Sequence, residues 1–235
     1  MGHLRFVSAA LGALACGVAM QVNAASDTFI TPSGSMAGGQ PVDASVLFTT
    51  GAGTVTITLN NLEANPRSAS QTLSDLFFTL SDGATTGTLA SSSGQELTIN
   101  PTTRAFTLGS TVSTGWGLNT GVMGGLQLDL LSTSTPPKHT IIGPPDMTGL
   151  YSNANSSLLG NHNPFLNQTA SFTVDISGVT PTTTITGATF SFGTSPGSNV
   201  IGTPTSVPEP ASLGLLGMGL AGLGLARRRS RKTQA

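Results

Sequence analysis

The chain is short of cysteine, aromatic side chains and charge. Its 235 residues include one cysteine, Cys16, one Trp and one Tyr, and charged residues make up 8% of the total. Cys16 stands in an apolar N-terminal stretch. Without that stretch the protein has no thiol, which excludes disulfides, thiolate metal sites and a cysteine nucleophile. The scarcity of aromatic rings also leaves little material for an aromatic-lined sugar cleft.

Positive charge is scarcest in the middle of the chain. Between Ala25 and Ser206 three basic residues, Arg67, Arg104 and Lys138, stand against nine acidic ones, a formal charge of −6. A body of this charge repels phosphate backbones, so nucleic acid is excluded as a partner. The net charge of the whole chain is close to zero because a basic tail offsets an acidic body.

The usual catalytic and metal-binding motifs are missing. No Gly-x-Ser-x-Gly elbow precedes a helix, and there is no His-Glu-x-x-His helix and no Asp-x-Asp-x-Asp-Gly loop. We therefore predict no catalytic residue, no metal and no cofactor. Three alternatives stay open: calcium held by separate loops, paired carboxylates for glycoside hydrolysis, and a hydrolase whose triad combines His139 or His162 with a serine and Asp129, Asp146 or Asp175.

Hydrophobic residues in the body recur with a period of two. In residues 54–59, Val55, Ile57 and Leu59 fall on one face and threonines on the other, as in a half-buried strand. The same alternation recurs at Leu97 and Ile99, at Leu126, Leu128 and Leu130, at Phe172, Val174 and Ile176, and at Phe190 and Phe192. Turn residues separate these runs, which predicts about eight to ten short antiparallel strands in one all-β domain, a β-sandwich or jelly roll, over residues 25–203.

Residues 132–167 break this rhythm, because they are rich in Pro, Asn and Ser and hold few strand candidates beyond Thr140 to Ile142. A connection of this length is functional or pinned to the core as a surface loop. In the functional interpretation Tyr151 offers its ring to a sugar; in the other, Phe165 and Leu166 attach the loop to the core. Trp116 has the same two interpretations, an exposed sugar platform or half-buried core. Trp116 and Tyr151 are thus the candidate ligand contacts.

The N-terminus has the features of a signal peptide. A short basic start precedes an apolar stretch over residues 6–20, and Val22 and Ala24 are the small residues that signal peptidase requires. This predicts cleavage between Ala24 and Ala25. The alternative is a lipoprotein, in which Cys16 follows Ala-Leu-Ala and becomes the acylated first residue.

The C-terminus carries three segments in a fixed order. These are Val207-Pro208-Glu209-Pro210, an apolar run over residues 211–226 and a basic tail over residues 227–235. The basic cluster consists of Arg227, Arg228, Arg229, Arg231 and Lys232. Basic residues after an apolar segment keep that end in the cytoplasm. Together the segments resemble the PEP-CTERM sorting signal of Gram-negative bacteria, which implies recognition and cleavage by an intramembrane exosortase.

The apolar run predicts a single transmembrane helix that anchors the protein temporarily. Its 16 residues reach about 24 Å as a helix, against a hydrocarbon core of about 30 Å. Small residues form one stripe along it, at Gly214, Gly217, Ala221 and Gly224. Small residues let another helix approach closely, so we expect this stripe to dock on the exosortase.

The organisation predicted is a signal peptide over 1–24, an exported body over 25–203 and a sorting signal over 204–235. The last part of the body, from Asn163 to Thr194, also resembles the C-terminal strands of uncharacterised PEP-CTERM proteins. The resemblance implies signal peptidase and exosortase as processing partners, and a transient stay in the inner membrane before the cell surface or extracellular matrix. It also implies association with exopolysaccharide. Together with the missing catalytic motifs, this predicts a structural matrix protein without enzymatic activity. The alternatives are a secreted carbohydrate-binding module and, less favoured, a secreted hydrolase.

Overall fold

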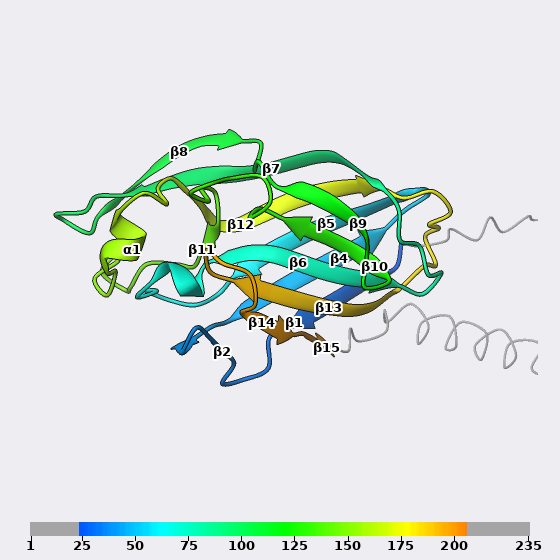
Figure 1. Ribbon diagram of the computed structural model, residues 1–235, viewed down its shortest axis with the longest axis horizontal. Helices are drawn as coiled ribbons and strands as arrows, with labels where there is room; N and C mark the ends of the chain where they lie inside the picture. Colours follow the sequence, from blue (N-terminus) through cyan, green and yellow to red (C-terminus); the bar gives the residue numbers. More distant parts are fainter. Residues whose placement is uncertain (1–23, 206–235) are drawn as a thin grey trace, which may run out of the picture.

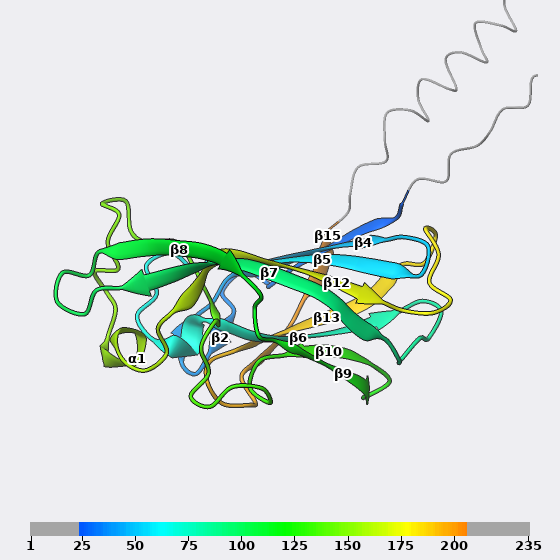
Figure 2. The ribbon, with the colours of Figure 1, turned by 90° about the horizontal axis from the view of Figure 1, so that it is seen from above.

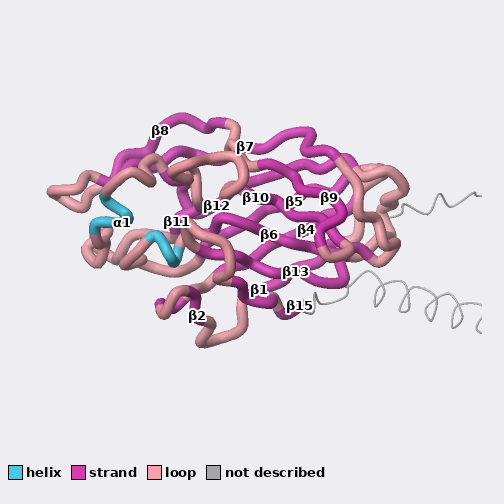
Figure 3. The backbone as a smooth tube through the Cα atoms, in the orientation of Figure 1, coloured by secondary structure: helices cyan, strands magenta, loops and turns pink. Residues whose placement is uncertain are grey.

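A computed structural model describes residues 24–205 as two packed layers of β-strands (Figures 1 and 2). Residues 1–23 of the predicted signal peptide (1–24) and residues 206–235 of the predicted sorting signal (204–235) lie outside the described residues. Two short helical turns, η1 (Ala69–Gln71) and α1 (Ser156–Leu159), are all the helix within residues 24–205 (Figure 3). The prediction of an all-β body is confirmed, and the two layers fit a β-sandwich.

The larger layer has seven strands, in the order β8-β7-β12-β5-β4-β1-β15. Their bounds are β1 Ser26–Ile30, β4 Ala44–Thr50, β5 Thr54–Asn61, β7 Thr88–Ile99, β8 Phe106–Val112, β12 Phe165–Asp175 and β15 Thr203–Thr205. All neighbours in this layer are antiparallel. β15 continues two residues beyond the predicted end of the body at residue 203.

The smaller layer has five antiparallel strands, in the order β9-β10-β6-β13-β14. Their bounds are β6 Leu73–Leu80, β9 Gly117–Val122, β10 Gly125–Asp129, β13 Ile185–Phe192 and β14 Asn199–Ile201. The two-residue strand β11 (Ile141–Ile142) joins the layers, because it pairs with both β6 and β12. A separate hairpin is formed by β2 (Met36–Ala37) and β3 (Gln40–Pro41).

The predicted alternation builds the core between the layers. Val55, Ile57 and Leu59 of β5 are fully buried, and Phe190 and Phe192 face them from the other layer as parts of one cluster. The remaining alternating residues of β10 and β12 belong to the same cluster. Burial of these side chains provides the main driving force for folding.

Two expectations for the body need correction. Residues 132–167 do not form one long loop, because they contain α1 and the first residues of β12 as well as β11, which coincides with the strand candidate at Thr140 to Ile142. The strands are also more numerous than expected, since five of the fifteen within residues 24–205 have only two or three residues each: β2, β3, β11, β14 and β15. Strands that short show no periodicity in the sequence.

The chain crosses from the smaller to the larger layer at Gly202, between β14 and β15. Its N–H donates to the Ala188 carbonyl over 2.9 Å. A Cβ atom at this position would lie 2.9 Å from the ring of Phe190 and 3.3 Å from Cβ of Phe29. Only glycine allows this close crossing, which brings β15 beside β1 at the edge of the larger layer.

No helix within residues 24–205 is both long and apolar enough to cross a bilayer. The predicted membrane helix over 211–226 lies outside the described residues.

Candidate functional site

The outer face of the smaller layer carries a row of polar side chains across four neighbouring strands. Asp129 on β10 pairs in register with Asp75 on β6, Asp75 with Ser191 on β13, and Ser191 with Asn199 on β14. The row exists because the alternate residues of these strands, such as Leu128, Leu76 and Phe190, point into the core. Side chains of aligned residues on adjacent strands lie on one face within contact distance.

A second row runs beside the first. It places Gln127 next to Phe77 and Phe77 next to Thr189, and Asn119 pairs with Gln127 from the edge strand β9. Phe77 supplies the one aromatic ring among these residues. The two rows together give a strip of amides, hydroxyls and carboxylates around a half-buried apolar ring.

Loops surround these rows, and together they form a hollow of about 430 Å³. One wall is the segment after β10, with Leu131, Ser134 and Pro137, and another is the β13–β14 turn, with Ser195 and Pro196. A hollow of this size falls in the range of small-molecule sites, about 300–1,000 Å³.

Asp75 is the most unusual group in the hollow. Its side chain is 7% exposed, and its Oδ1 atom is buried without a hydrogen-bond partner. Its Oδ2 atom accepts a hydrogen bond from Nε2 of Gln127. Burial, and to a lesser extent the neighbouring Asp129, raises the pKa of the Asp75 carboxyl to about 7, against the opposing effect of the Gln127 hydrogen bond. Asp75 therefore exchanges its proton near neutral pH.

Asp129 has a different environment on the neighbouring strand. Its Oδ2 accepts from Nδ2 of Asn119 over 3.1 Å, and its Oδ1 accepts from the backbone N–H of Leu131 over 2.8 Å. Both oxygens face N–H donors, which suits a carboxylate. Two adjacent carboxyl groups thus differ in what surrounds them.

The described part of the chain holds no group of three or more His, Cys, Asp or Glu side chains that could bind a metal ion. What the hollow offers is hydrogen bonding from the amides of Gln127 and Asn199 and the hydroxyls of Ser191 and Thr189. Such a mixture of donors and acceptors matches a ligand rich in hydroxyl groups.

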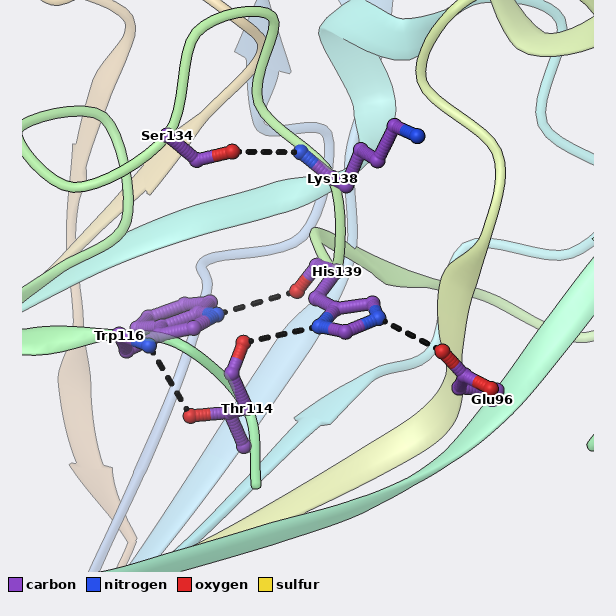
Figure 4. Close-up of polar contacts among 6 residues, drawn as sticks. All are labelled: Glu96, Thr114, Trp116, Ser134, Lys138 and His139. Atoms are coloured by element: carbon purple, nitrogen blue, oxygen red, sulfur yellow. Dashed lines mark hydrogen bonds and ion pairs between the residues drawn. The ribbon is translucent and has the colours of Figure 1, made fainter. Parts of the chain in front are cut away.

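His139 lies in a second polar cluster, together with Glu96, Thr114 and Trp116 (Figure 4). Its Nε2 lies 2.9 Å from Oε1 of Glu96 on β7, and its Nδ1 lies 3.1 Å from the Thr114 carbonyl oxygen. The backbone carbonyl of His139 accepts from Nε1 of Trp116 over 3.0 Å. Because both ring nitrogens are engaged by acceptors, His139 braces these segments and has no free nitrogen to activate a nucleophile.

His162 does not join this cluster. Its Nδ1 lies 2.9 Å from the Pro137 carbonyl oxygen. The acidic residues considered for a triad are placed elsewhere: Asp129 binds Asn119 and Leu131, and Asp146 binds Thr148 and Ser152 within its own loop. Among the described residues, His139 and Glu96 form the one ion pair.

The two aromatic candidates for ligand contact are buried. Trp116 is 4% exposed and packs on Phe172 with ring centroids 5.3 Å apart. Tyr151 is fully buried, and its hydroxyl donates to the Gly143 carbonyl over 2.9 Å. Neither ring can offer a face to a sugar in this structure, so the assignment of both as ligand contacts is corrected to core residues.

The C-terminal segment decides what kind of protein this is. Residues 206–230 match the PEP-CTERM protein-sorting motif. The chain carries a PEP-CTERM sorting signal. It is therefore an exported, membrane-transiting protein of Gram-negative type, processed by an exosortase.

Comparisons with curated proteins and with solved structures gave no match for the chain. The sorting motif thus describes the protein's route, and the body must be interpreted from its own geometry.

The remaining predicted site residues lie outside residues 24–205, apart from the cleavage point. Outside are Val22, the sorting motif 207–210, the small-residue stripe and the basic cluster. Ala24 is exposed, and Ala25 donates its N–H to the Pro181 carbonyl over 2.7 Å. The body is therefore tied down from the first residue after the predicted cleavage point.

The residues of the hollow were missed by the sequence analysis, except that Asp129 was weighed for a triad. One signal was present: Gln127 and Asp129 are the polar positions of the alternating strand 126–130. Which residues would flank them across the sheet depends on strand order, and the sequence of one strand does not contain that information.

Proposed function

We propose that the exported body is a non-catalytic protein of the cell surface or extracellular matrix that holds exopolysaccharide in the hollow on its smaller layer. The observation that carries this proposal is the in-register row Asp129, Asp75, Ser191 and Asn199 across four strands. Three strand spacings of about 4.8 Å make the row about 14 Å long, which suits an elongated ligand.

The chemistry of the lining supports a sugar. A sugar hydroxyl both donates and accepts, so it is well matched by amides and hydroxyls, as in Gln127, Asn199 and Thr189. Phe77 adds an apolar surface for the C–H face of a pyranose ring. The acidic charge of the body favours neutral or cationic polysaccharide, because anionic polymers would be repelled.

The sorting signal supports the location. We expect signal peptidase to release the body at Ala25 and the 211–226 segment to hold it briefly in the inner membrane, with the small-residue stripe against the exosortase. Processing then leaves the body at the cell surface or in the matrix, where polysaccharide is the abundant polymer.

A glycoside hydrolase is the second candidate, and one observation favours it. Asp75 and Asp129 stand side by side, and the raised pKa of Asp75 is what a general acid requires. Against it, Oδ1 of Asp75 is buried and its Oδ2 is covered by Gln127, while both oxygens of Asp129 accept N–H groups. Neither carboxyl group presents a free oxygen to a glycosidic bond, so we favour binding.

The test uses the purified body, residues 25–206, and the host's own exopolysaccharide. Affinity electrophoresis measures binding, and release of reducing ends measures cleavage in the same samples. Gln127→Ala and Asn199→Ala should each weaken binding, by up to about tenfold for one lost hydrogen bond of 0.5–1.5 kcal/mol. Gln95→Ala, which removes an amide from β7 in the larger layer, is the matched control and should bind as the unmodified body does.

The outcomes separate the candidates. Binding that is weakened by the two hollow variants and unaffected by the control supports the proposal. Binding that both variants leave unchanged contradicts the site, and reducing ends that disappear in Asp75→Asn establish the hydrolase instead.

A further inference from the structure

The last strand of the body leads directly into the sorting signal. β15 pairs with β1 through Thr205 opposite Thr28 and Thr203 opposite Ile30, and the sorting motif begins at residue 206. β15 lies at the edge of the larger layer, at the same end of the sandwich as the start of β1 (Figure 2).

This connection leaves little distance between the folded body and the membrane. Residues 206–210 separate Thr205 from the apolar run; even fully extended, five residues span at most about 18 Å. The polar region on one side of a bilayer takes up about 5–8 Å of that length. A body folded through β15 would therefore stand roughly 10 Å above the headgroups, where the exosortase must reach the Pro208-Glu209-Pro210 motif.

The end of the sandwich that faces the membrane is not suited to rest on it. Asp27, Asp82 and Asp175 lie at this end, with Asp82 and Asp175 exposed. The three basic residues of the described chain, Arg67, Arg104 and Lys138, lie toward the opposite end, near α1 and β11. An end with carboxylates and without cations gains nothing from anionic lipid headgroups.

β15 is held weakly compared with what precedes it. Thr203 and Pro204 are exposed and Thr205 is half-buried. Pro204 has no N–H to donate, and the hydroxyls of Thr203 and Thr205 reach the β1 carbonyls only at 3.3 Å. Segments with few buried contacts open locally at low cost.

Gly202, immediately before β15, is held firmly. It is buried against Phe190 and Phe29 and donates to Ala188. If β15 separates from β1 as far as Gly202, residues 203–205 join residues 206–210 in the connection between the body and the apolar run. These eight residues, fully extended, span up to about 28 Å.

From these contacts we propose that β15 separates from β1 when the exosortase engages the sorting signal, and that Gly202 is the last residue to remain packed on the folded body. The partner of this end of the sandwich is thus the exosortase, and the released β15 provides the reach that the enzyme requires. Cleavage then frees the strand to pair with β1 again. This inference is independent of any ligand in the hollow.

The test is a disulfide that prevents the separation. Thr28→Cys with Thr205→Cys joins β1 to β15 on the outer side of the sheet, and Ile30→Cys with Thr203→Cys is a second lock at the next outward pair. The only native cysteine is Cys16, within the predicted signal peptide, so thiol alkylation reports the introduced pair. The full chain is expressed in its host, and full-length and processed protein are followed in membrane and extracellular fractions.

Full-length locked protein should accumulate in the membrane, and a reductant should restore its processing. A control disulfide, Leu47→Cys with Thr58→Cys, joins the facing strands β4 and β5 and should leave release unchanged. Inserting six Gly and Ser residues between Thr205 and Ser206 of the locked chain should also restore processing, because it supplies the missing reach.

Two results would overturn the proposal. One is release of the locked chain, with its disulfide intact, at the rate of the unmodified protein. The other is a locked chain that stays unprocessed despite the inserted residues, since the block would then not be one of reach.

Discussion

Asp75 and Asp129 lie directly opposite each other on β6 and β10, two carboxyl groups at the floor of one hollow. The one ion pair of the described chain joins His139 to Glu96, so neither carboxyl group has a basic partner there. The Asp75 carboxyl group therefore lowers the stability of the folded body, because its Oδ1 is buried without a hydrogen-bond partner.

The first prediction concerns stability against pH. The pKa of Asp75 is about 7 in the folded body and near 3.8 when unfolded, so the folded state binds this proton more tightly. The contribution of Asp75 to the free energy of unfolding is most favourable below about pH 4. It decreases by a few kcal/mol as the pH rises to 7, and it is constant at higher pH. Asp75→Asn should therefore raise the free energy of unfolding at pH 8 and leave it nearly unchanged at pH 4, as measured by urea denaturation.

Asp129→Asn is the matched control for this experiment. Both oxygens of Asp129 accept N–H groups, and an amide would turn its own NH2 toward one of those donors. This variant should be less stable than the unmodified body at pH 8. An Asp75→Asn variant that is likewise destabilised at pH 8 would show that the buried Asp75 carboxylate does not destabilise the folded body.

The second prediction concerns Tyr151, the sole tyrosine. Burial raises the pKa of its phenol above the usual 10, so alkaline titration followed by absorbance should show ionisation only when the body unfolds. Tyr151→Phe leaves the Gly143 carbonyl without its donor and should cost about 1–3 kcal/mol of stability. Polysaccharide binding should be unaffected; selective loss of binding at unchanged stability would return Tyr151 to the ligand site.

The third prediction concerns Trp116, whose fluorescence is the only tryptophan signal. Since the ring is buried and its Nε1 donates to His139, emission should be blue-shifted and protected from iodide until unfolding. Trp116→Ala should cost about 3–5 kcal/mol, the usual loss for a large buried ring. Strong quenching of the native body by iodide would contradict its place in the core.

The fourth prediction concerns the first residue of the exported protein. Ala25 donates its N–H to Pro181 and is followed at once by β1, so cleavage after Ala24 would leave no loose leader. Intact mass and N-terminal sequencing of released protein should give Ala25. A lipidated Cys16 would instead establish the lipoprotein alternative.

The longer strands were predictable because one buried face imposes a period of two on their sequences. This alternation is seen directly in β5, β10, β12 and β13. The sorting signal can be recognised from the order of its three segments. β11, β14 and β15 are too short for any period, and Tyr151 lies in a segment whose polar neighbours suggest a surface loop. Its burial depends on the fold around it.

The hollow could not be predicted for a different reason. Asp75 and Gln127 are 52 residues apart in sequence and meet only because β6 and β10 pair in one register. Ser191 and Asn199 join them through two further pairings. Local pattern gives each strand its polar face but does not say which strands are neighbours.

The most direct test of the account is to map the ligand contacts on the body itself. Amide chemical shifts of the isotope-labelled body, residues 25–206, are followed while fragments of the host's exopolysaccharide are added. The largest changes should fall around Asp75, Gln127, Ser191 and Asn199 on the smaller layer. Changes confined to the larger layer, or no change at saturating polysaccharide, would contradict it.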